Sequence, residues 1–223
     1  MSYNDVKCQG VYPPASFACQ SVEFSFEPKN LKTESLFFMI MIEKVKEAVM
    51  EVADEDDWKF HLSLVVKYAK HLAKIEKVNE EIVELAALLH DIGRLKFGGE
   101  DHEITGVPEA EKILKKLDSP DEVIEEVKHC VRSHRASKDY PAKTKIAEII
   151  RDADAISHFD IIPILIEVGL RKHKGDVREA IKWVHAKIDR DWNNKMHLPE
   201  SKKLAEEKYK AAKLLLKSAE DCF

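Results

Sequence analysis

The sequence predicts an all-α protein, and three observations support that fold class. From about residue 31 onward, apolar residues recur at three- and four-residue spacing, the periodicity of one helix face. The whole chain of 223 residues contains only seven glycines and eight prolines, so long stretches lack the residues that interrupt helices. No segment shows the alternating pattern of a strand. We expect a helical bundle rather than a solenoid, because no internal repeat appears.

The apolar periodicity places the helices at 32–53, 57–76, 79–91, 106–117, 120–133, 144–157, 159–171, 176–190 and 200–220. Local signals mark some of their ends. Asn79 is expected to cap the third helix, and Ser119-Pro120 supplies a cap and a first-turn proline for the fifth. Gly93 is expected to stop the third helix in a left-handed conformation.

The first thirty residues differ in composition from the rest of the chain. They carry five charged residues, whereas the other 193 carry 72. We expect residues 1–30 to form a poorly structured arm and residues 31–223 to form one helical domain, with the C-terminal helices packed on it. Met39 or Met41 is then an alternative start of translation, which N-terminal sequencing of the native protein would test.

Charge and cysteine content exclude several classes of protein. A net charge of −5 argues against a general nucleic-acid binder, although a local basic pocket is compatible with it. The longest uncharged apolar run, 36–42, is far shorter than the roughly 20 residues of a membrane span. The four cysteines lack the spacing of a zinc site and the density of a disulfide scaffold. We therefore expect a cytoplasmic protein without a membrane segment.

His61 is expected to point into the core, because it lies in line with Val65, Tyr68 and Leu72 on one helix face. A buried imidazole needs a partner for each nitrogen. A metal on one nitrogen and a hydrogen bond on the other would satisfy it. The alternative is a core histidine bonded to a carbonyl, which is the commoner case for an isolated residue.

His90 and Asp91 follow Leu85–Leu89, a segment that is apolar on every side and must therefore be buried. A carboxylate at the end of such a helix faces the negative end of the helix dipole, and burying it unpaired is costly. A bound cation would stabilise Asp91. A nearby arginine, Arg94, would do so equally well, and the sequence leaves both interpretations open.

Asp154 is the better ligand candidate of two nearby aspartates, because it borders the apolar stripe of its helix. Asp152 lies about 120° away on the helix. It is expected to be solvated or to accept a hydrogen bond from a ligating histidine.

His134 shares a stripe with Val127 and Cys130 and should reach inward, whereas His129 lies on the opposite face. His102 follows a glycine-rich connection and precedes an expected helix start near Gly106, where anions are favoured. It would bind a second metal or a phosphate, or it is an exposed loop histidine. No cluster is assigned to His158, His173, His185 and His197.

In this order, His61, His90-Asp91 and Asp154 resemble the signature of the HD-domain family of metal-dependent phosphohydrolases. The resemblance runs from about residue 41 to the C-terminus, and the small, free-standing HD hydrolases look like the nearest branch. The further matching segments are Ala86–Arg94, His102 with Gly106 and Ala110, Ser133-His134, Pro141 and Thr144 before Asp152–Asp154, and Lys203–Glu207.

Two departures limit what the resemblance implies about substrate. Many relatives carry Arg-Leu-Asp after the Asp-Ala-Asp segment, whereas residues 155–157 of this chain are Ala-Ile-Ser. That wording is closer to the ribonuclease Y branch. The adjacent histidine pair and the Gly-Tyr-Pro segment of the cyclic-dinucleotide phosphodiesterases are absent from the sequence. Fold similarity alone does not fix the substrate.

The resemblance implies an all-α bundle of the HD-domain type with one or two divalent metal ions (Mn²⁺, Fe²⁺, Co²⁺, Ni²⁺ or Zn²⁺). The implied metal ligands are His61, His90, Asp91 and Asp154. Asp91 and Arg94 are the expected catalytic residues. A second metal or the substrate phosphate would be bound by His102, His134 and Arg135.

We therefore expect a phosphohydrolase that uses metal-activated water on a nucleotide or another small phosphate ester. One alternative is a phosphodiesterase acting on RNA or cyclic nucleotides. Another is a regulatory module that binds a nucleotide or metal without turnover, and a third is a structural helical protein without metal. Helix 32–53 is expected to pack on the bundle or on a second subunit of a homo-oligomer.

Overall fold

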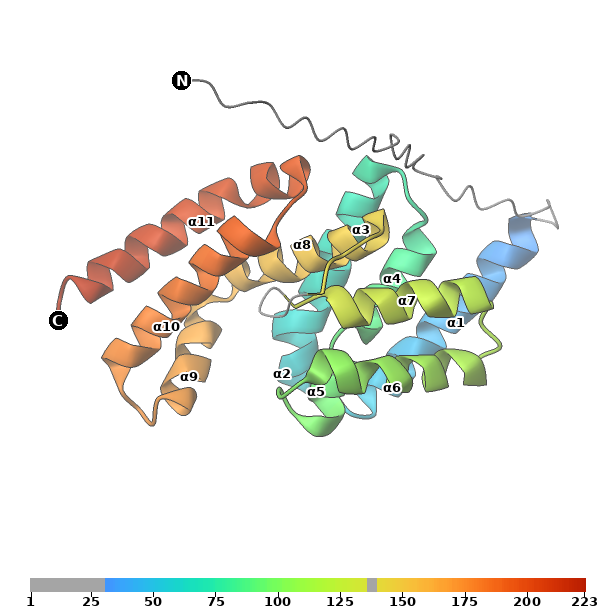
Figure 1. Ribbon diagram of the computed structural model, residues 1–223, viewed down its shortest axis with the longest axis horizontal. Coiled ribbons are helices and arrows are strands. Elements are labelled where there is room, and N and C mark those ends of the chain that lie inside the picture. Colours follow the sequence, from blue (N-terminus) through green and yellow to red (C-terminus); the bar gives the residue numbers. More distant parts are fainter. Residues whose placement is uncertain (1–30, 136–139) are drawn as a thin grey trace, which may run out of the picture.

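The computed structural model describes residues 31–135 and 140–223, and these residues form helices without any strand, as the sequence predicts (Figure 1). The expected N-terminal arm, 1–30, lies outside the described residues. The first part of the chain forms α1 (Leu31–Met50), α2 (Glu55–Asp57), the π-helical turn η1 (Trp58–Leu62), α3 (Ser63–Glu76), α4 (Glu80–Leu89), α5 (Ile92–Phe97), α6 (His102–Lys116) and α7 (Asp121–Ser133). The second part forms α8 (Lys145–Asp160), α9 (Ile162–Lys172), α10 (Val177–Arg190), the π-helical turn η2 (Asp191–Lys195) and α11 (Pro199–Glu220).

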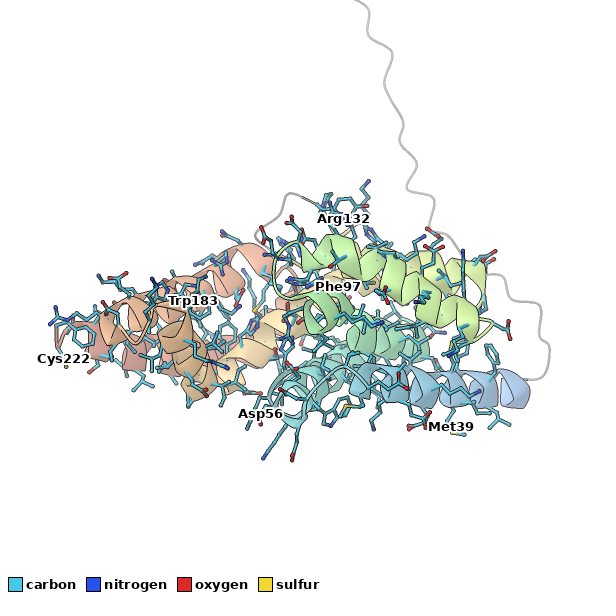
Figure 2. All side chains as sticks on the ribbon, turned by 90° about the horizontal axis from the view of Figure 1, so that it is seen from below. Met39, Asp56, Phe97, Arg132, Trp183 and Cys222 are labelled. Carbon is cyan, nitrogen blue, oxygen red and sulfur yellow. The ribbon has the colours of Figure 1, made fainter. Side chains whose placement is uncertain are left out.

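Helix α8 joins two groups of helices (Figure 1). On one side, α8 packs along α3, and α4, α7, α6 and α1 complete that group. On the other side, α9 and α11 pack against α10, with α11 also contacting α8. Figure 2 shows Cys222 at the far end of the second group with Trp183 further in, and Met39 toward the opposite end of the molecule.

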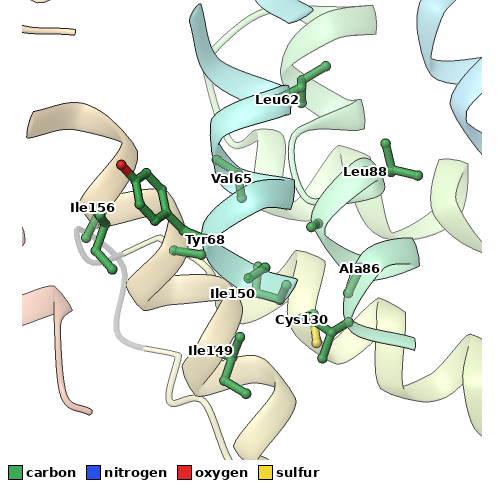
Figure 3. Close-up of a cluster of buried hydrophobic side chains, with 14 of the residues drawn as sticks. Leu62, Val65, Tyr68, Ala86, Leu88, Cys130, Ile149, Ile150 and Ile156 are labelled. Atoms are coloured by element: carbon green, nitrogen blue, oxygen red, sulfur yellow. The ribbon is translucent and has the colours of Figure 1, made fainter. Parts of the chain in front are cut away.

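The core is formed by the apolar stripes that the sequence predicts. In Figure 3, α3 with Val65 lies between α8, which carries Ile150, and α4, which carries Leu88. Val65, Ile149 and Ile150 are fully buried. Each such side chain contributes about 1.5–3 kcal/mol through removal of its apolar surface from water. This packing fixes α3, α4 and α8. His61 lies just before α3, His90 and Asp91 follow α4, and Asp154 lies on α8.

Two predicted start signals have different outcomes. The Asn79 side chain accepts a hydrogen bond of 2.8 Å from the backbone N–H of Ile82, which confirms it as the cap of α4. Ser119 does not cap α7, because Pro120 occupies the N-cap position and makes no side-chain cap bond. The prediction for Ser119 is wrong by one residue, since the proline adopts the extended conformation that precedes the helix.

Gly93 does not stop the third predicted helix. That helix ends at Leu89, and Gly93 lies inside the short helix α5. A Cβ atom on Gly93 would lie 2.2 Å from the backbone oxygen of His102 and 2.6 Å from the backbone nitrogen of Gly106. Glycine is therefore required by the close approach of α5 to α6 and not by a left-handed conformation. Helix α6 begins at His102, earlier than the expected start near Gly106.

Helix α1 packs on the bundle through Met41, Val45 and Val49, which are buried. Phe38 and Ile42 are partly buried against the same core, whereas other apolar side chains of the helix, including Met39 at 56% exposure, face outward (Figure 2). The expected contact of this helix with a second subunit stays a prediction. Across the described parts of the chain, no helix is long and apolar enough to cross a membrane.

Candidate metal centre

The structure brings all the predicted ligands to one place. His61 comes from η1, His90 and Asp91 connect α4 to α5, and Asp154 lies on α8. The second set, His102 and His134, comes from the start of α6 and the end of α7. All of these side chains are buried except His61, which is 14% exposed.

The first cluster contains His61, His90 and Asp154. The Nε2 atoms of the two histidines are 3.1 Å apart, and His61 Nε2 is 3.7 Å from Asp154 Oδ1. The candidate ligand atoms all lie within 4.8 Å of one another, close enough to bind a single metal ion. Among the described residues, this is one of two such groups.

The second cluster contains Asp91, His102 and His134. The two histidine Nε2 atoms are 3.0 Å apart, and they lie 3.2 Å and 3.3 Å from Asp91 Oδ1. The other oxygen of the carboxylate, Oδ2, is 3.2 Å from His61 Nε2 in the first cluster. Asp91 therefore stands between the clusters and presents one oxygen to each.

Hydrogen bonds to backbone carbonyls fix the tautomers of three histidines. The Nδ1 atoms of His90, His102 and His134 lie 2.7–2.9 Å from the oxygens of Ala87, Gly99 and Val131. A carbonyl only accepts, so each Nδ1 carries the proton and each neutral ring presents an unprotonated Nε2. Two lone pairs at 3.0 Å cannot hydrogen-bond to each other. A cation between the rings would satisfy both, which is the usual arrangement of metal-binding histidines.

Burial keeps most of these imidazoles neutral. It lowers the pKa of His61, His90 and His134 below the ordinary value. At His102, burial also acts to lower the pKa, but the hydrogen bond with Asp91 raises it overall. Three of the four rings are therefore in the form that binds metals near neutral pH.

Both carboxylates are held in the ionised form. Burial alone would raise the pKa of Asp91, but neighbouring His90, Arg94 and His102 hold it well below its usual range. Burial likewise opposes ionisation of Asp154, and Lys195 is the largest influence that lowers its pKa. A set of imidazole nitrogens and ionised carboxylate oxygens suits a divalent first-row metal ion.

The structure shows one of the two partners that the sequence left open for Asp91, namely Arg94. Its Nε donates to Asp91 Oδ2 at 2.6 Å, and its Nη1 donates to Asp57 Oδ1 at 3.1 Å. Arg94 therefore pairs with Asp91, while the other oxygen of Asp91 faces the bare nitrogens of His102 and His134. The arginine and a cation can both act on this carboxylate.

A cleft of about 560 Å³ opens onto the clusters. Its lining includes an apolar face of α9 and an acidic edge at α2, where Asp56 lies (Figure 2). Arg135 lines it as well, with its guanidinium bonded at 2.6 Å to the buried carboxylate of Glu103. The volume is in the range of pockets that bind small organic ligands.

Several residues at the cleft were not identified from the sequence. The ring of His158 stacks on that of His61 at 5.7 Å and 8°, and its Nε2 is 3.5 Å from Asp154 Oδ1. Its Nδ1 lies 2.9 Å from Asp191 Oδ2, and Lys195 forms an ion pair with Asp154. The four-residue spacing from Asp154 could have identified His158, because it places both on one helix face.

The prediction for Asp152 is wrong. Its side chain is buried, and it accepts hydrogen bonds from the backbone N–H groups of His197 and Leu198 at 2.8–3.2 Å. It is neither solvated nor bonded to a ligating histidine. Asp152 instead holds the segment that enters α11, where otherwise unpaired backbone donors need an acceptor.

The two other histidine predictions can be compared with the structure. His102 is 9% exposed, so it is not an exposed loop histidine. His129 lies outside both clusters, as expected, and accepts a hydrogen bond of 2.9 Å from the backbone N–H of Lys143.

Comparison with known proteins agrees with this arrangement. Residues 60–158, which contain every candidate ligand, match the HD domain. The chain is 31% identical over 141 residues to a tRNA (cytidine(56)-2'-O)-methyltransferase of Picrophilus torridus, a match covering 57% of this chain and 40% of that protein. It therefore spans less than half the length of this relative.

Two solved structures share the fold. Bacillus subtilis YpgQ in complex with ADP superposes with a TM-score of 0.64 at 21% identity, covering 84% of this chain and 97% of that chain. A predicted HD superfamily hydrolase from an uncultured Thermotogales bacterium gives a TM-score of 0.55 at 22% identity, covering 85% and 96%. At these identities the likeness concerns the fold alone. The segment 60–158 is therefore an HD domain, and both His and Asp clusters lie inside it.

Proposed function

We propose that this protein is a metal-dependent phosphohydrolase that cleaves a phosphate ester of a nucleotide or another small molecule. The observation that carries the proposal is the convergence of the Nε2 atoms of His102 and His134 on the ionised carboxylate of Asp91. In this proposal one metal ion is held by His61, His90 and Asp154, and a second by His102 and His134, with Asp91 contributing to both. The metal identity is open among the divalent first-row ions.

A bound divalent ion would supply a water molecule of lowered pKa and polarise a phosphoryl oxygen. The residues of the chain would bind and orient this ion. Asp91 and Asp154 supply the negative charge that retains the ion, and Arg94 acts on Asp91 by orienting its carboxylate. Arg94 is thus a positioning residue, since its hydrogen bonds to Asp91 and Asp57 are both to carboxylates.

Arg135 is the candidate for binding the substrate phosphate, because its side chain lines the cleft beside His102 and His134. Glu103 holds one guanidinium nitrogen at 2.6 Å, which fixes the direction of the group. An oriented guanidinium suits phosphate oxygens, which it binds through parallel hydrogen bonds.

The nucleotide part of the proposal rests on two observations. The cleft has the size of a small-molecule site, and the protein of similar fold, YpgQ, was crystallised with ADP. The partial likeness to a tRNA-modifying enzyme favours a second candidate, hydrolysis of a phosphodiester in RNA. The net charge of −5 does not suit general RNA binding, so that candidate requires a short RNA end reaching into the cleft.

The test is product release from nucleoside mono-, di- and triphosphates, cyclic nucleotides and short RNA, after chelation and addition of each candidate metal. The metal-loaded wild type should turn over at least one compound, and His90→Ala should not. Lys182→Gln is the matched control, because this exposed lysine pairs only with nearby Glu179 on the same helix. Metal-bound protein that binds nucleotide without releasing product would favour the regulatory module. Turnover that is insensitive to chelation and to His90→Ala would contradict the proposal.

A further inference from the structure

We propose that the substrate carries more than one phosphate group, and that Lys187 and Arg190 bind a phosphate other than the one at the metal centre. The substrate class is then nucleoside di- or triphosphates. This inference rests on the proposed function, whose site it extends along the cleft.

A wall of basic side chains faces the cleft from α10 and η2. Lys187, Arg190 and Lys195 all line it. Lys195 is only 5% exposed and forms an ion pair with Asp154, which brings this wall to the edge of the first cluster. Lys187 is 16% exposed, and its Nζ lies 3.3 Å from Asp191 Oδ2. The wall is therefore continuous from the metal centre into the cleft.

The acidic partners of this wall do not balance its charge. Asp191 serves both Lys187 and His158, since its Oδ2 lies 2.9 Å from His158 Nδ1. Asp154, the partner of Lys195, also belongs to the first metal cluster. Arg190 forms no ion pair with any residue in the described parts of the chain. Partly buried cations without full compensation are costly, and a bound anion would compensate them.

The remaining lining explains why the anion is expected to belong to a nucleotide. On α9 and the residue before it, Ile161, Ile164, Leu165 and Val168 follow the three- and four-residue spacing of one helix face, and all of them line the cleft. This apolar face suits the flat, weakly polar surface of a nucleobase. With a monophosphate at the metal centre, Lys187 would still share Asp191 with His158, and Arg190 would still lack an ion pair within the described residues. A di- or triphosphate would supply the additional negative charge.

The direct test is anion binding to Mn²⁺-loaded protein by calorimetry, with orthophosphate and the hydrolysis-resistant imidodiphosphate as probes. Imidodiphosphate should bind more tightly, and Arg190→Gln should reduce that preference about ten-fold, the effect of one charge-assisted hydrogen bond. Affinity for orthophosphate should stay unchanged. Lys182→Gln, on the outer face of the same helix, should leave both affinities unchanged.

Kinetics supply a second readout. Arg190→Gln should raise KM for ADP and ATP and leave hydrolysis of AMP at its wild-type rate. The second phosphate site is disproved if Arg190→Gln and Lys187→Gln leave the preference for imidodiphosphate intact. It is also disproved if both variants lower the affinity for orthophosphate and imidodiphosphate equally. Selective loss of imidodiphosphate binding in a protein without any hydrolytic activity would support the site and refute the proposed function.

Discussion

The two walls of the cleft differ in what they lack. The wall built from η1, α4, α6, α7 and α8 presents bare nitrogens and ionised carboxylates, a set of donors that needs a cation. The wall built from α10 and η2 presents lysine and arginine side chains with too few acids, a set that needs an anion. A phosphorylated substrate bound to metal ions would satisfy both walls at once.

The difference also shows how each wall is held. Three histidines of the two clusters are fixed by hydrogen bonds from Nδ1 to backbone carbonyls of their own helices or turns. Lys187 and Lys195 are fixed by carboxylates, which are themselves bound to neighbouring groups. Both walls carry a π-helical turn, η1 with His61 and η2 with Lys195. Such turns are frequent at functional sites.

The largest expected effect is the loss of activity in Asp91→Asn. The amide has nearly the same shape, but it lacks the charge that faces both clusters. Loss of a metal ligand should lower kcat/KM by more than about 100-fold, beyond the effect of removing an outer partner. Steady-state kinetics with saturating metal measure this. A kcat/KM of the variant within a few-fold of the wild-type value would show that Asp91 is not an essential metal ligand.

Gly93→Ala tests the close approach of α5 to α6 that brings Asp91 near His102. The added Cβ would meet backbone atoms 2.2 Å and 2.6 Å away, which cannot move independently of their helix. We expect a loss of about 2–4 kcal/mol in the free energy of unfolding, measured in urea. Gly99→Ala is the control, because a Cβ there meets no atom within 4 Å. Equal stability of the two variants would show that the approach is not required.

Metal binding should stabilise the fold and distinguish the two clusters. At a free Mn²⁺ concentration of 100 times Kd, one site adds about 2.7 kcal/mol, or roughly 5–10 °C in Tm for a chain of this size. His134→Ala should reduce both the Tm shift and the metal content, from about two ions per chain to one. Differential scanning calorimetry and elemental analysis measure these quantities. Unchanged metal content would argue against a site at His134.

The smallest expected effect is an acid-dependent one at Asp191, on the basic wall. Burial opposes ionisation of this residue, but Lys187 and His158 hold its pKa below the ordinary value. A lowered pKa in the folded state means stability that is present above the unfolded value of about 3.9 and lost as the pH falls below it. The stability gap between wild type and Asp191→Asn, measured by urea unfolding with chelator, should therefore shrink below about pH 4. A stability difference that widens below about pH 4 would show that the pKa of Asp191 is raised in the folded protein rather than lowered.

Much of the fold could be predicted because the apolar stripes coincide with buried faces, as Val65 and Ile150 show. The exception was the region around Gly93, where glycine was interpreted as a helix stop. Its role depends on backbone atoms of α6, a contact between segments that a local pattern cannot reveal. The π-helical turns were missed for a related reason. Such a turn contains one residue more than an α-helical turn, which hardly alters the spacing of apolar side chains along the sequence.

The residues that form the two clusters could be predicted from helix faces and from the resemblance, because a polar residue within an apolar stripe is easily recognised. The basic wall could not. Lys187 and Lys195 lie on helices where lysine is ordinarily solvated. Lys195 becomes buried, and Lys187 partly buried, only when α10 and η2 pack beside α8. Asp152 misled for the same reason, since its partners are backbone groups 45 and 46 residues away.

The most direct test of the central claim is a crystal structure of protein loaded with Mn²⁺, with the metal located by anomalous scattering. We expect one anomalous peak among His61, His90 and Asp154. A second peak is expected beside His102 and His134, with Asp91 reaching both metal positions. Density for metal elsewhere, with the histidine nitrogens still facing one another at both clusters, would contradict it.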